Sequence, residues 1–291
     1  MTLRLLIATL FLAIGASAAQ PQRIVSGAPS ITEMLYALGL GDRVVGVTEF
    51  CHYPPEVREK PKIGSYMSPS VETILSMRPD MVVVLEEHQG LAARLERVGL
   101  KTLAVQHNDL AGIYTSLRDI GEAAGVTPTA EKVVAGIQAE LAEVAALAER
   151  LPRRKTMFVV GRSPGSLHDL VCVGRGSFLN ELIELAGGEN LFQSTASFYP
   201  KIGREEILAR RPEVVVDMGD MSDTDEVTEA HRQSVAGLWK QELPDLPAVR
   251  SGRVYAVAED LFVVPGPRVG ETARRFLEMI HPEAAKAREA R

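Results

Sequence analysis

The chain has 291 residues, of which 46% are hydrophobic, 24% charged and 5% aromatic, and its formal net charge is −6. This length accommodates one large domain or two ordinary ones, and the apolar fraction suffices for a packed core, which excludes a wholly disordered chain. The acidic balance argues against nucleic acid as the main partner, because binding to phosphates requires a basic face. Two cysteines are too few for a disulfide scaffold.

Residues 1–19 have the pattern of a cleaved secretory signal peptide. A single Arg4 precedes an apolar run over residues 5–14, and small residues ending in Ala18-Ala19 follow it. The run is shorter than the roughly 20 residues that span a bilayer. No cysteine follows it at the position that lipid attachment requires. The sequence therefore predicts an exported, periplasmic protein that is not a lipoprotein and does not insert directly into the membrane.

Behind this leader, residues 20–127 alternate between short apolar strands and amphipathic helices. The segment Ser30-Ile-Thr-Glu33 has the pattern of a capping box and predicts the start of a helix through residue 38. Such alternation is typical of a parallel sheet with crossover helices, and it predicts an N-terminal α/β lobe. We expect strands over 23–27, 44–48, 81–85 and 102–105, and helices over 30–38, 91–98 and 110–124.

The longest helical pattern covers residues 128–151. Its apolar stripe consists of Val133, Val134, Ile137, Leu141, Val144 and Leu147. About 22 residues at 1.5 Å each reach ~33 Å, the width of a domain, so this segment predicts a rigid linking helix. The alternative is an ordinary surface helix of one lobe. The remaining residues, 152–291, predict a C-terminal α/β lobe with strands over 157–160, 214–216 and 254–257 and helices over 177–186 and 270–280.

A repeat relates the two lobes at a constant offset of 133 residues. The segments 72–84 and 205–217 share seven of thirteen residues, including a Glu-x-Ile-Leu-x-x-Arg-Pro pattern followed by a valine-rich run. Each copy predicts a short helix, a stop at Arg-Pro and a buried strand. Tyr66 and Tyr199 each lie six residues before the glutamate of their copy, Glu72 or Glu205. The alternative is coincidence among common αβ patterns.

Several motifs occur in an order that resembles a known family. They are Ala28-Pro-Ser-Ile-Thr-Glu33, Gly39-Leu-Gly-Asp-Arg-Val-Val-Gly-Val47, Tyr53-Pro-Pro55, Gly187-Gly-Glu-Asn190 and Pro265-Gly-Pro-Arg268, together with both copies of the repeat. In combination they resemble the helical-backbone (class III) periplasmic substrate-binding proteins of ABC importers, over residues 23–281. That family includes receptors for cobalamin, haem and iron–siderophore complexes, and the run from Phe50 to Glu72 is most similar to the cobalamin receptors.

The resemblance implies an α/β fold of two similar Rossmann-like lobes with parallel sheets, joined by one long backbone helix, with a ligand cleft between them. By position it implies that Phe50, Tyr66 and Tyr199 stack on the ligand. The best-known cobalamin receptor has tryptophan at the latter two positions, so this chain departs from it there. It also implies that Glu72 and Glu205 dock on a permease dimer whose ATPase subunits supply the energy. The alternative for each glutamate is a favourable place at a helix N-terminus.

Three further residues are candidate ligand contacts. His52 follows Phe50, Glu87 follows the first repeat strand, and Arg175 lies in a Gly-x-Gly turn. Ligands of parallel sheets bind beyond the carboxyl ends of the strands, where Glu87 is expected. For each of them an ordinary solvated loop residue is the alternative. Cys51 and Cys172, one in each lobe, are expected to stay unpaired, since a bridge across the cleft would obstruct ligand exchange.

These observations lead to one prediction with alternatives. Gly-x-Ser-x-Gly, His-Glu-x-x-His and P-loop motifs are absent from the sequence, so an enzyme is not expected. We predict a monomeric periplasmic receptor that binds a corrinoid, needs no cofactor or metal of its own, and delivers the cobalt-containing cargo to an ABC permease. The runner-up is the same receptor type for haem or a ferric siderophore. Weaker alternatives are a zinc or metal-ion receptor and a sensor without a transport role. The candidate zinc ligands are Glu86-Glu87-His88, His107 and His168.

Overall fold

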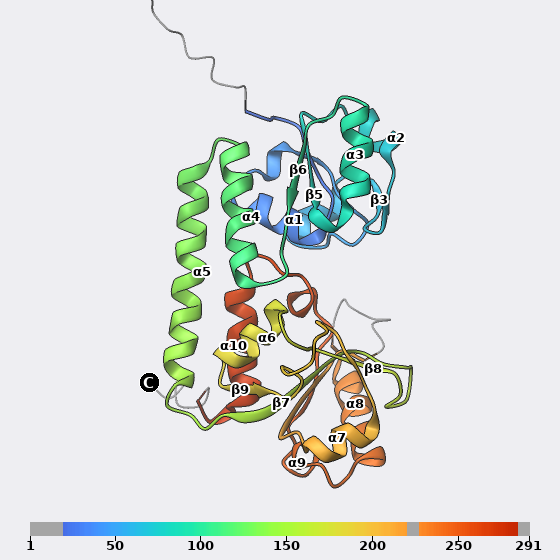
Figure 1. Cartoon of the computed structure of the whole chain (residues 1–291), viewed down its shortest axis with the longest axis vertical. Coiled ribbons are helices and arrows are strands. Elements are labelled where there is room, and N and C mark those ends of the chain that lie inside the picture. Colours follow the sequence, from blue (N-terminus) through green and yellow to red (C-terminus); the bar gives the residue numbers. More distant parts are fainter. Residues whose placement is uncertain (1–19, 220–226, 285–291) are drawn as a thin grey trace, which may run out of the picture.

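Two α/β lobes lie one above the other beside a long helix (Figure 1). The computed structural model describes residues 20–219 and 227–284; the expected signal peptide lies outside them. We use "N-lobe" for residues 20–127 and "C-lobe" for residues 152–284. The α/β class and the two-lobe arrangement predicted from the sequence are confirmed.

The N-lobe is built on a parallel four-stranded sheet in the order β2-β1-β5-β6. Its central strand β5 is buried throughout, as a valine-rich strand covered on both faces should be. Helices cover the sheet, and a short β3–β4 hairpin carries Tyr66 in its turn. The elements are β1 (Ile24–Ser26), α1 (Pro29–Ala37), β2 (Val44–Gly46), β3 (Gly64–Ser65), β4 (Ser68–Pro69), α2 (Val71–Ser76), β5 (Met81–Leu85), α3 (Gln89–Arg97), β6 (Thr102–Val105) and α4 (Leu110–Ala123).

The C-lobe sheet is mixed, with the order β10-β8-β7-β11-β12 and β9 paired to β7. Its core strands β7, β11 and β12 are parallel, whereas β8 and β10 add an antiparallel edge that the sequence did not predict. These edge strands are only two or three residues long and lack a clear apolar period. The elements are β7 (Arg154–Gly161), β8 (Leu170–Cys172), α6 (Phe178–Leu185), β9 (Gly188–Asn190), β10 (Lys201–Ile202), α7 (Arg204–Arg210), β11 (Val214–Asp217), α8 (Glu229–Glu242), α9 (Pro247–Arg250), β12 (Val254–Ala256) and α10 (Val269–Ile280).

Helix α5 (Thr127–Ala148) packs against both lobes. It contacts α4 of the N-lobe and α10 and α6 of the C-lobe, and Figure 1 shows it running alongside both. Its buried stripe, which includes Val134, Ile137 and Leu141, belongs to one hydrophobic cluster that extends from Leu117 in α4 to Phe276 in α10. The lobes therefore share a core along this helix. The predicted stripe is largely correct, although Leu147, at the far end of the helix, is exposed.

The sequence repeat is also a structural repeat. An arginine in the left-handed region follows each of the helices α2 and α7: Arg78 (φ 48°) and Arg211 (φ 54°). The proline that follows each arginine disfavours the right-handed helical conformation there. The carboxylate that follows each proline accepts a backbone hydrogen bond of 2.9 Å. Asp80 accepts it from the N–H of Arg23, just before β1, and Glu213 from the N–H of Lys155 in β7. The same local chemistry thus joins each helix to its sheet.

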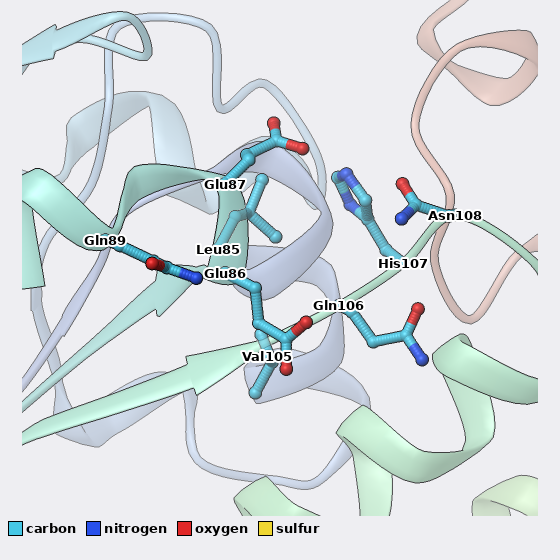
Figure 2. A pocket seen from close by; sticks show the side chains of 8 residues that line it. All are labelled: Leu85, Glu86, Glu87, Gln89, Val105, Gln106, His107 and Asn108. Carbon is cyan, nitrogen blue, oxygen red and sulfur yellow. The ribbon is translucent and has the colours of Figure 1, made fainter. Parts of the chain in front are cut away.

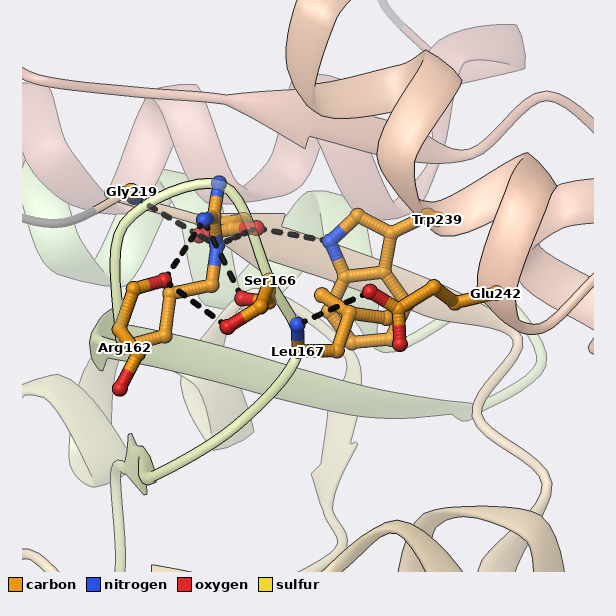
Figure 3. A network of polar contacts seen from close by, with 8 residues as sticks. Arg162, Ser166, Leu167, Gly219, Trp239 and Glu242 are labelled. Carbon is orange, nitrogen blue, oxygen red and sulfur yellow. Dashed lines mark hydrogen bonds and ion pairs between the residues drawn. The ribbon is translucent and has the colours of Figure 1, made fainter.

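A buried polar network holds the carboxyl end of β11 in the C-lobe (Figure 3). Asp217, which is fully buried, accepts hydrogen bonds from Trp239 Nε1 at 2.7 Å and from Arg162 Nε at 3.0 Å. It also accepts one from the backbone N–H of Gly219 at 2.7 Å. The Asp217 carboxylate is therefore paired with a cation, and both of its oxygens accept hydrogen bonds. It connects the loop after β7 to helix α8 without leaving an isolated ion in the core.

A second buried ion pair connects the lobes directly. Arg268, just before α10, donates to Glu33 of α1 through Nε (2.9 Å) and Nη2 (2.5 Å). Its guanidinium also lies over the ring of Tyr53, 3.9 Å from the centroid. Glu33 is buried, which raises the pKa of its carboxyl, and the nearby Arg268 opposes that shift. The predicted capping box is therefore wrong: Ala28 precedes the helix without a side-chain cap, and Glu33 faces the other lobe.

We expect Arg268→Ala to lower the free energy of unfolding by about 3 kcal/mol at pH 7, because it leaves the Glu33 carboxylate buried without its partner. The pKa of Glu33 would then rise further above its ordinary value. When the folded-state pKa of a carboxyl is raised, the free energy of unfolding falls as the pH rises from the ordinary pKa to the raised one. The loss of stability in Arg268→Ala should therefore shrink as the pH falls toward 4.5, the ordinary pKa. Urea unfolding at both pH values measures this.

The matched control is Arg274→Ala, also on α10. Arg274 pairs with Glu140 of α5 at 3.1 Å, but both side chains are partly exposed to solvent. We expect a change below about 1 kcal/mol at either pH. Equal losses of stability in the two variants would contradict the role given to the Glu33–Arg268 pair.

Candidate ligand-binding cleft

A cavity of about 800 Å³ lies between the lobes. This volume is within the range of about 300–1,000 Å³ typical of small-molecule sites. Loops at the carboxyl ends of the N-lobe strands form one wall, and the loops before α6, before β10 and before α10 form the other. The lining residues are Ala28, Pro29, Ser30, Phe50, His52, Tyr66, Glu87, His107, Asn108, Ser177, Phe178, Phe198, Tyr199, Asp260, Val263, Val264 and Pro265.

Aromatic side chains from both lobes face this cavity. Phe50 and Tyr66 belong to the N-lobe, and Phe198 and Tyr199 to the C-lobe. Phe50 is 56% exposed, Phe198 50% and Tyr199 43%, which is high for rings of this size. Rings on opposite walls offer apolar area to a flat ligand at little cost in side-chain entropy.

Two glycines bring Phe198 and Tyr199 to the wall. Gly174 donates its N–H to the carbonyl of Phe198 at 2.7 Å, and a Cβ there would lie 2.2 Å from the carbonyl of Ser197. Gly176 has φ +86° and lies against the Phe198 ring. The Gly-x-Gly turn therefore permits a close approach of two loops, and Arg175 within it is exposed and does not line the cavity.

Tyr66 is held by its neighbours in the N-lobe. Its hydroxyl donates a hydrogen bond to Glu87, and its ring lies 4.8 Å from the ring of His88. Partial burial and the adjacent Glu87 carboxylate raise the pKa of Tyr66 well above its usual value. The phenol is therefore a neutral donor at neutral pH, with its ring oriented in the wall.

A smaller polar cavity of about 240 Å³ adjoins the cleft at the ends of β5 and β6 (Figure 2). It shares Glu87, His107 and Asn108 with the main cavity, and the sequence analysis missed Asn108. His107 Nδ1 lies 2.7 Å from Ser30 Oγ, so the serine of the supposed capping box contacts a residue of the cleft. Burial lowers the pKa of His107, which favours a neutral imidazole.

His52 and Cys51 have different surroundings although they are adjacent. His52 Nδ1 lies 3.4 Å from Asp260 of the C-lobe, so this pair spans the cleft. Cys51 is buried, with Sγ 3.2 Å from Thr32 Oγ1 and 3.1 Å from Thr48 Oγ1, and it does not line the cavity. Burial raises the pKa of its thiol. Both cysteines are buried and free, as expected.

The charge of the cleft is uniform in sign. Glu87 and Asp260 are its acidic lining residues, and no lysine or arginine is among the described residues that line it. Arg268 lies nearby, but its guanidinium is bonded to Glu33. Among residues 20–219 and 227–284, no group of three His, Cys, Asp or Glu side chains is placed to hold a metal ion.

The structure brings five of the six predicted ligand contacts together. Phe50, His52, Tyr66, Glu87 and Tyr199 line one cavity, and Arg175 does not. The sequence did not predict the aromatic residue Phe198, although Phe198 directly precedes Tyr199. It also did not predict the apolar residues that complete the lining of the cavity. The predicted docking glutamates, Glu72 in α2 and Glu205 in α7, are exposed and lie outside the cleft. The further missed residues are Phe178, Val263, Val264 and Pro265.

Comparison with known proteins agrees with this architecture. A family model described as "Periplasmic binding protein" matches residues 24–261. The chain belongs to the periplasmic binding protein family. It is 31% identical to the uncharacterized ABC transporter substrate-binding lipoprotein YvrC of Bacillus subtilis, over 92% of this chain and 82% of the relative. This member of the family is therefore a substrate receptor of an ABC importer and not an enzyme.

Two other relatives differ in their stated ligands. The vitamin B12-binding protein of Vibrio parahaemolyticus is 26% identical, over 85% of each chain. The apo structure of the periplasmic heme-binding protein RhuT from Roseiflexus sp. aligns with a TM-score of 0.76 at 27% identity, and covers 90% of this chain and 99% of that chain. The receptor type is thus common to these proteins, while the ligand varies among them.

One prediction is corrected by these relatives. The sequence analysis predicted a periplasmic protein that is not a lipoprotein, but YvrC, which matches most of the chain, is a lipoprotein. The prediction is therefore wrong. It depended on the leader sequence alone, and residues 1–19 lie outside the described residues. In the part of the chain that the structure describes, none of the helices combines the length and apolar character that crossing a bilayer requires.

We expect Glu87→Gln to lower the pKa of Tyr66 toward its ordinary value, because a neutral amide no longer repels the phenolate. Partial burial would persist, so the return would be incomplete. Alkaline titration of tyrosinate absorbance, with the Tyr66→Phe variant subtracted, measures the change. The control is Glu86→Gln in the same turn, which makes no bond to Tyr66 and should leave this pKa where it is. A fall of the pKa in both variants, or in neither, would refute the assigned hydrogen bond.

Proposed function

We propose that this receptor binds a corrinoid between its lobes and, as a monomer, delivers it to an ABC permease dimer with ATPase subunits. In this proposal Phe50, Tyr66 and Tyr199 stack on the ring, and His52 and Glu87 contact its polar edge. Phe198 joins the stacking residues because it lies on the same wall.

One observation carries the choice of ligand: the cleft combines aromatic walls with acidic charge and has no basic lining residue in the described chain. A corrinoid is large and flat and carries neutral carboxamide arms, whose N–H groups can donate to Glu87, Asp260 and the Asn108 amide oxygen. Haem carries propionates and ferric siderophores carry acidic chelating groups, so both would meet carboxylates without a cation to pair them. The B12-binding relative from Vibrio supports the same choice.

Haem is the second candidate, favoured by the likeness to the Roseiflexus heme-binding protein. A tyrosine can ligate ferric iron as a phenolate. The Tyr66 phenol, however, donates to Glu87 and its pKa is raised, which opposes loss of the proton. The absorption spectrum of the purified protein with its retained ligand separates a corrin from a haem.

The delivery step is assigned to Glu72 and Glu205. Both are exposed, and they occupy equivalent positions in α2 and α7, one on each lobe. Two separated carboxylates on one body fix the orientation of a docked partner and accelerate encounter with a basic surface. In this proposal each one meets a basic side chain of one permease subunit.

For the cleft we expect Tyr66→Ala and Tyr199→Ala each to weaken dicyanocobinamide binding by about tenfold, because each removes one stacking ring. The matched phenylalanine variants keep the ring and should stay within about threefold of the original affinity. Isothermal titration calorimetry measures these affinities. Failure of the unmodified protein to bind cyanocobalamin or dicyanocobinamide at micromolar concentration would reject the corrinoid. Loss of haem binding in Tyr66→Phe would instead favour the second candidate.

For docking we expect the double variant Glu72→Ala, Glu205→Ala to abolish ligand uptake by cells while ligand affinity in vitro is unchanged, since neither residue lines the cleft. Glu149→Ala, an exposed glutamate just beyond α5, is the matched control and should support normal uptake. Normal uptake by the double variant would show that the docking residues lie elsewhere.

A further inference from the structure

The helices that carry Glu72 and Glu205 also carry an exposed leucine at the same position. Leu75 in α2 is 37% exposed, and Leu208 in α7 is 45% exposed. Each leucine lies three residues after its glutamate, which places the two side chains on one face of the helix. Each helix therefore presents a carboxylate and a leucine side by side.

Leu75 and Leu208 are both exposed because the two helices pack on their lobes in the same way. The residue before each leucine, Ile74 or Ile207, is fully buried in the core of its lobe, so each short helix already has an apolar residue on its inner face. The leucines are additional apolar side chains turned toward solvent. Exposed apolar residues that occur singly are ordinary. Here the same pair of side chains recurs at an offset of 133 residues, in helices that are each followed by an arginine in the left-handed region.

We propose that Leu75 and Leu208 are the apolar contacts of the permease-docking surface, each buried in a groove of one permease subunit next to the basic residue that meets Glu72 or Glu205. This inference rests on the docking role proposed above for the glutamates. The partner is defined by its chemistry: a dimer with two equivalent sites, each with a basic side chain beside an apolar groove.

The arrangement of the two helices supports a two-site partner. Figure 1 shows α2 in the upper lobe and α7 in the lower lobe, both away from α5. The lobes share a core along α5, so the two faces belong to one body with a restricted spacing. A dimer with two-fold symmetry offers the same surface twice, and two like faces on one ligand-binding protein match it.

The two side chains of each face have different physical effects. Charges at the rim of an interface steer encounter and orientation, and contribute little to the lifetime of the complex. Burial of a leucine removes apolar area from water and contributes to affinity directly, by about tenfold or more. The glutamates should therefore control mainly the rate of association, and the leucines mainly the rate of dissociation.

The experiment measures binding of the full chain to its cognate permease–ATPase complex in lipid nanodiscs, by biolayer interferometry. We expect Leu75→Ala and Leu208→Ala each to weaken binding by about tenfold through faster dissociation, and the double variant by about a hundredfold, because the sites are far apart and additive. Glu72→Gln and Glu205→Gln should slow association. Leu147→Ala, a 43% exposed leucine of α5 without a repeat partner, is the matched control and should bind normally. Dicyanocobinamide affinity and thermal midpoint should be the same in every variant.

The outcomes separate this inference from the function on which it rests. If the glutamine variants bind the permease normally, the proposed docking role of the glutamates fails. If they bind poorly while the leucine variants match Leu147→Ala, only the leucine inference fails. An effect at one leucine alone overturns the equivalence of the two faces. A dimer of this chain that sedimentation detects and Leu75→Ala abolishes would assign the faces to a second copy and overturn the permease assignment.

Discussion

The shared hydrophobic core along α5 is the constraint on which the rest of the molecule depends. Residues of α4, α5 and α10 belong to one cluster, so the lobes cannot separate without exposing apolar side chains such as Ile137 and Phe276 to water. Relative motion of the lobes is therefore restricted to small rotations and twists about α5. A cleft that is preformed in this way orders few groups when the ligand enters, which limits the entropic cost of binding.

An ion pair beside the cleft adds a polar constraint to this apolar one. Arg268 and Glu33 pair across the lobes, and Val264 and Pro265, which precede Arg268 in the chain, line the cleft. Pairing with Glu33 also occupies the guanidinium of Arg268, which lies close to the cleft. The same pair thus contributes to the arrangement of the lobes and to the acidic character of the site.

Much of this fold is predictable from local patterns. Valine-rich strands, the long apolar stripe of α5 and the 133-residue repeat all appear in the sequence, because their signals are periodic and short in range. The roles of Ser30 and Glu33 are not local: their partners are His107, 77 residues away, and Arg268, 235 residues away. A capping-box pattern cannot distinguish a helix start from two side chains that face a cleft. The antiparallel edge of the C-lobe was missed for a related reason, because strands of two or three residues carry no period of their own.

In each lobe the repeat places a proposed ligand contact close to a proposed docking residue. In the N-lobe, Tyr66 in the cleft wall and Glu72 on the outer face are six residues apart, joined by β4 and the start of α2. In the C-lobe, Tyr199 and Glu205 are joined in the same way by β10 and the start of α7. Both connections are short, and each is held by strand pairing, β4 with β3 and β10 with β8, so a displacement of the wall is transmitted along them. A ligand that fixes the distance between the aromatic walls therefore also fixes the distance between the outer faces. A partner with two sites at a set spacing would consequently distinguish the loaded receptor from the empty one by differential affinity, without contact to the ligand.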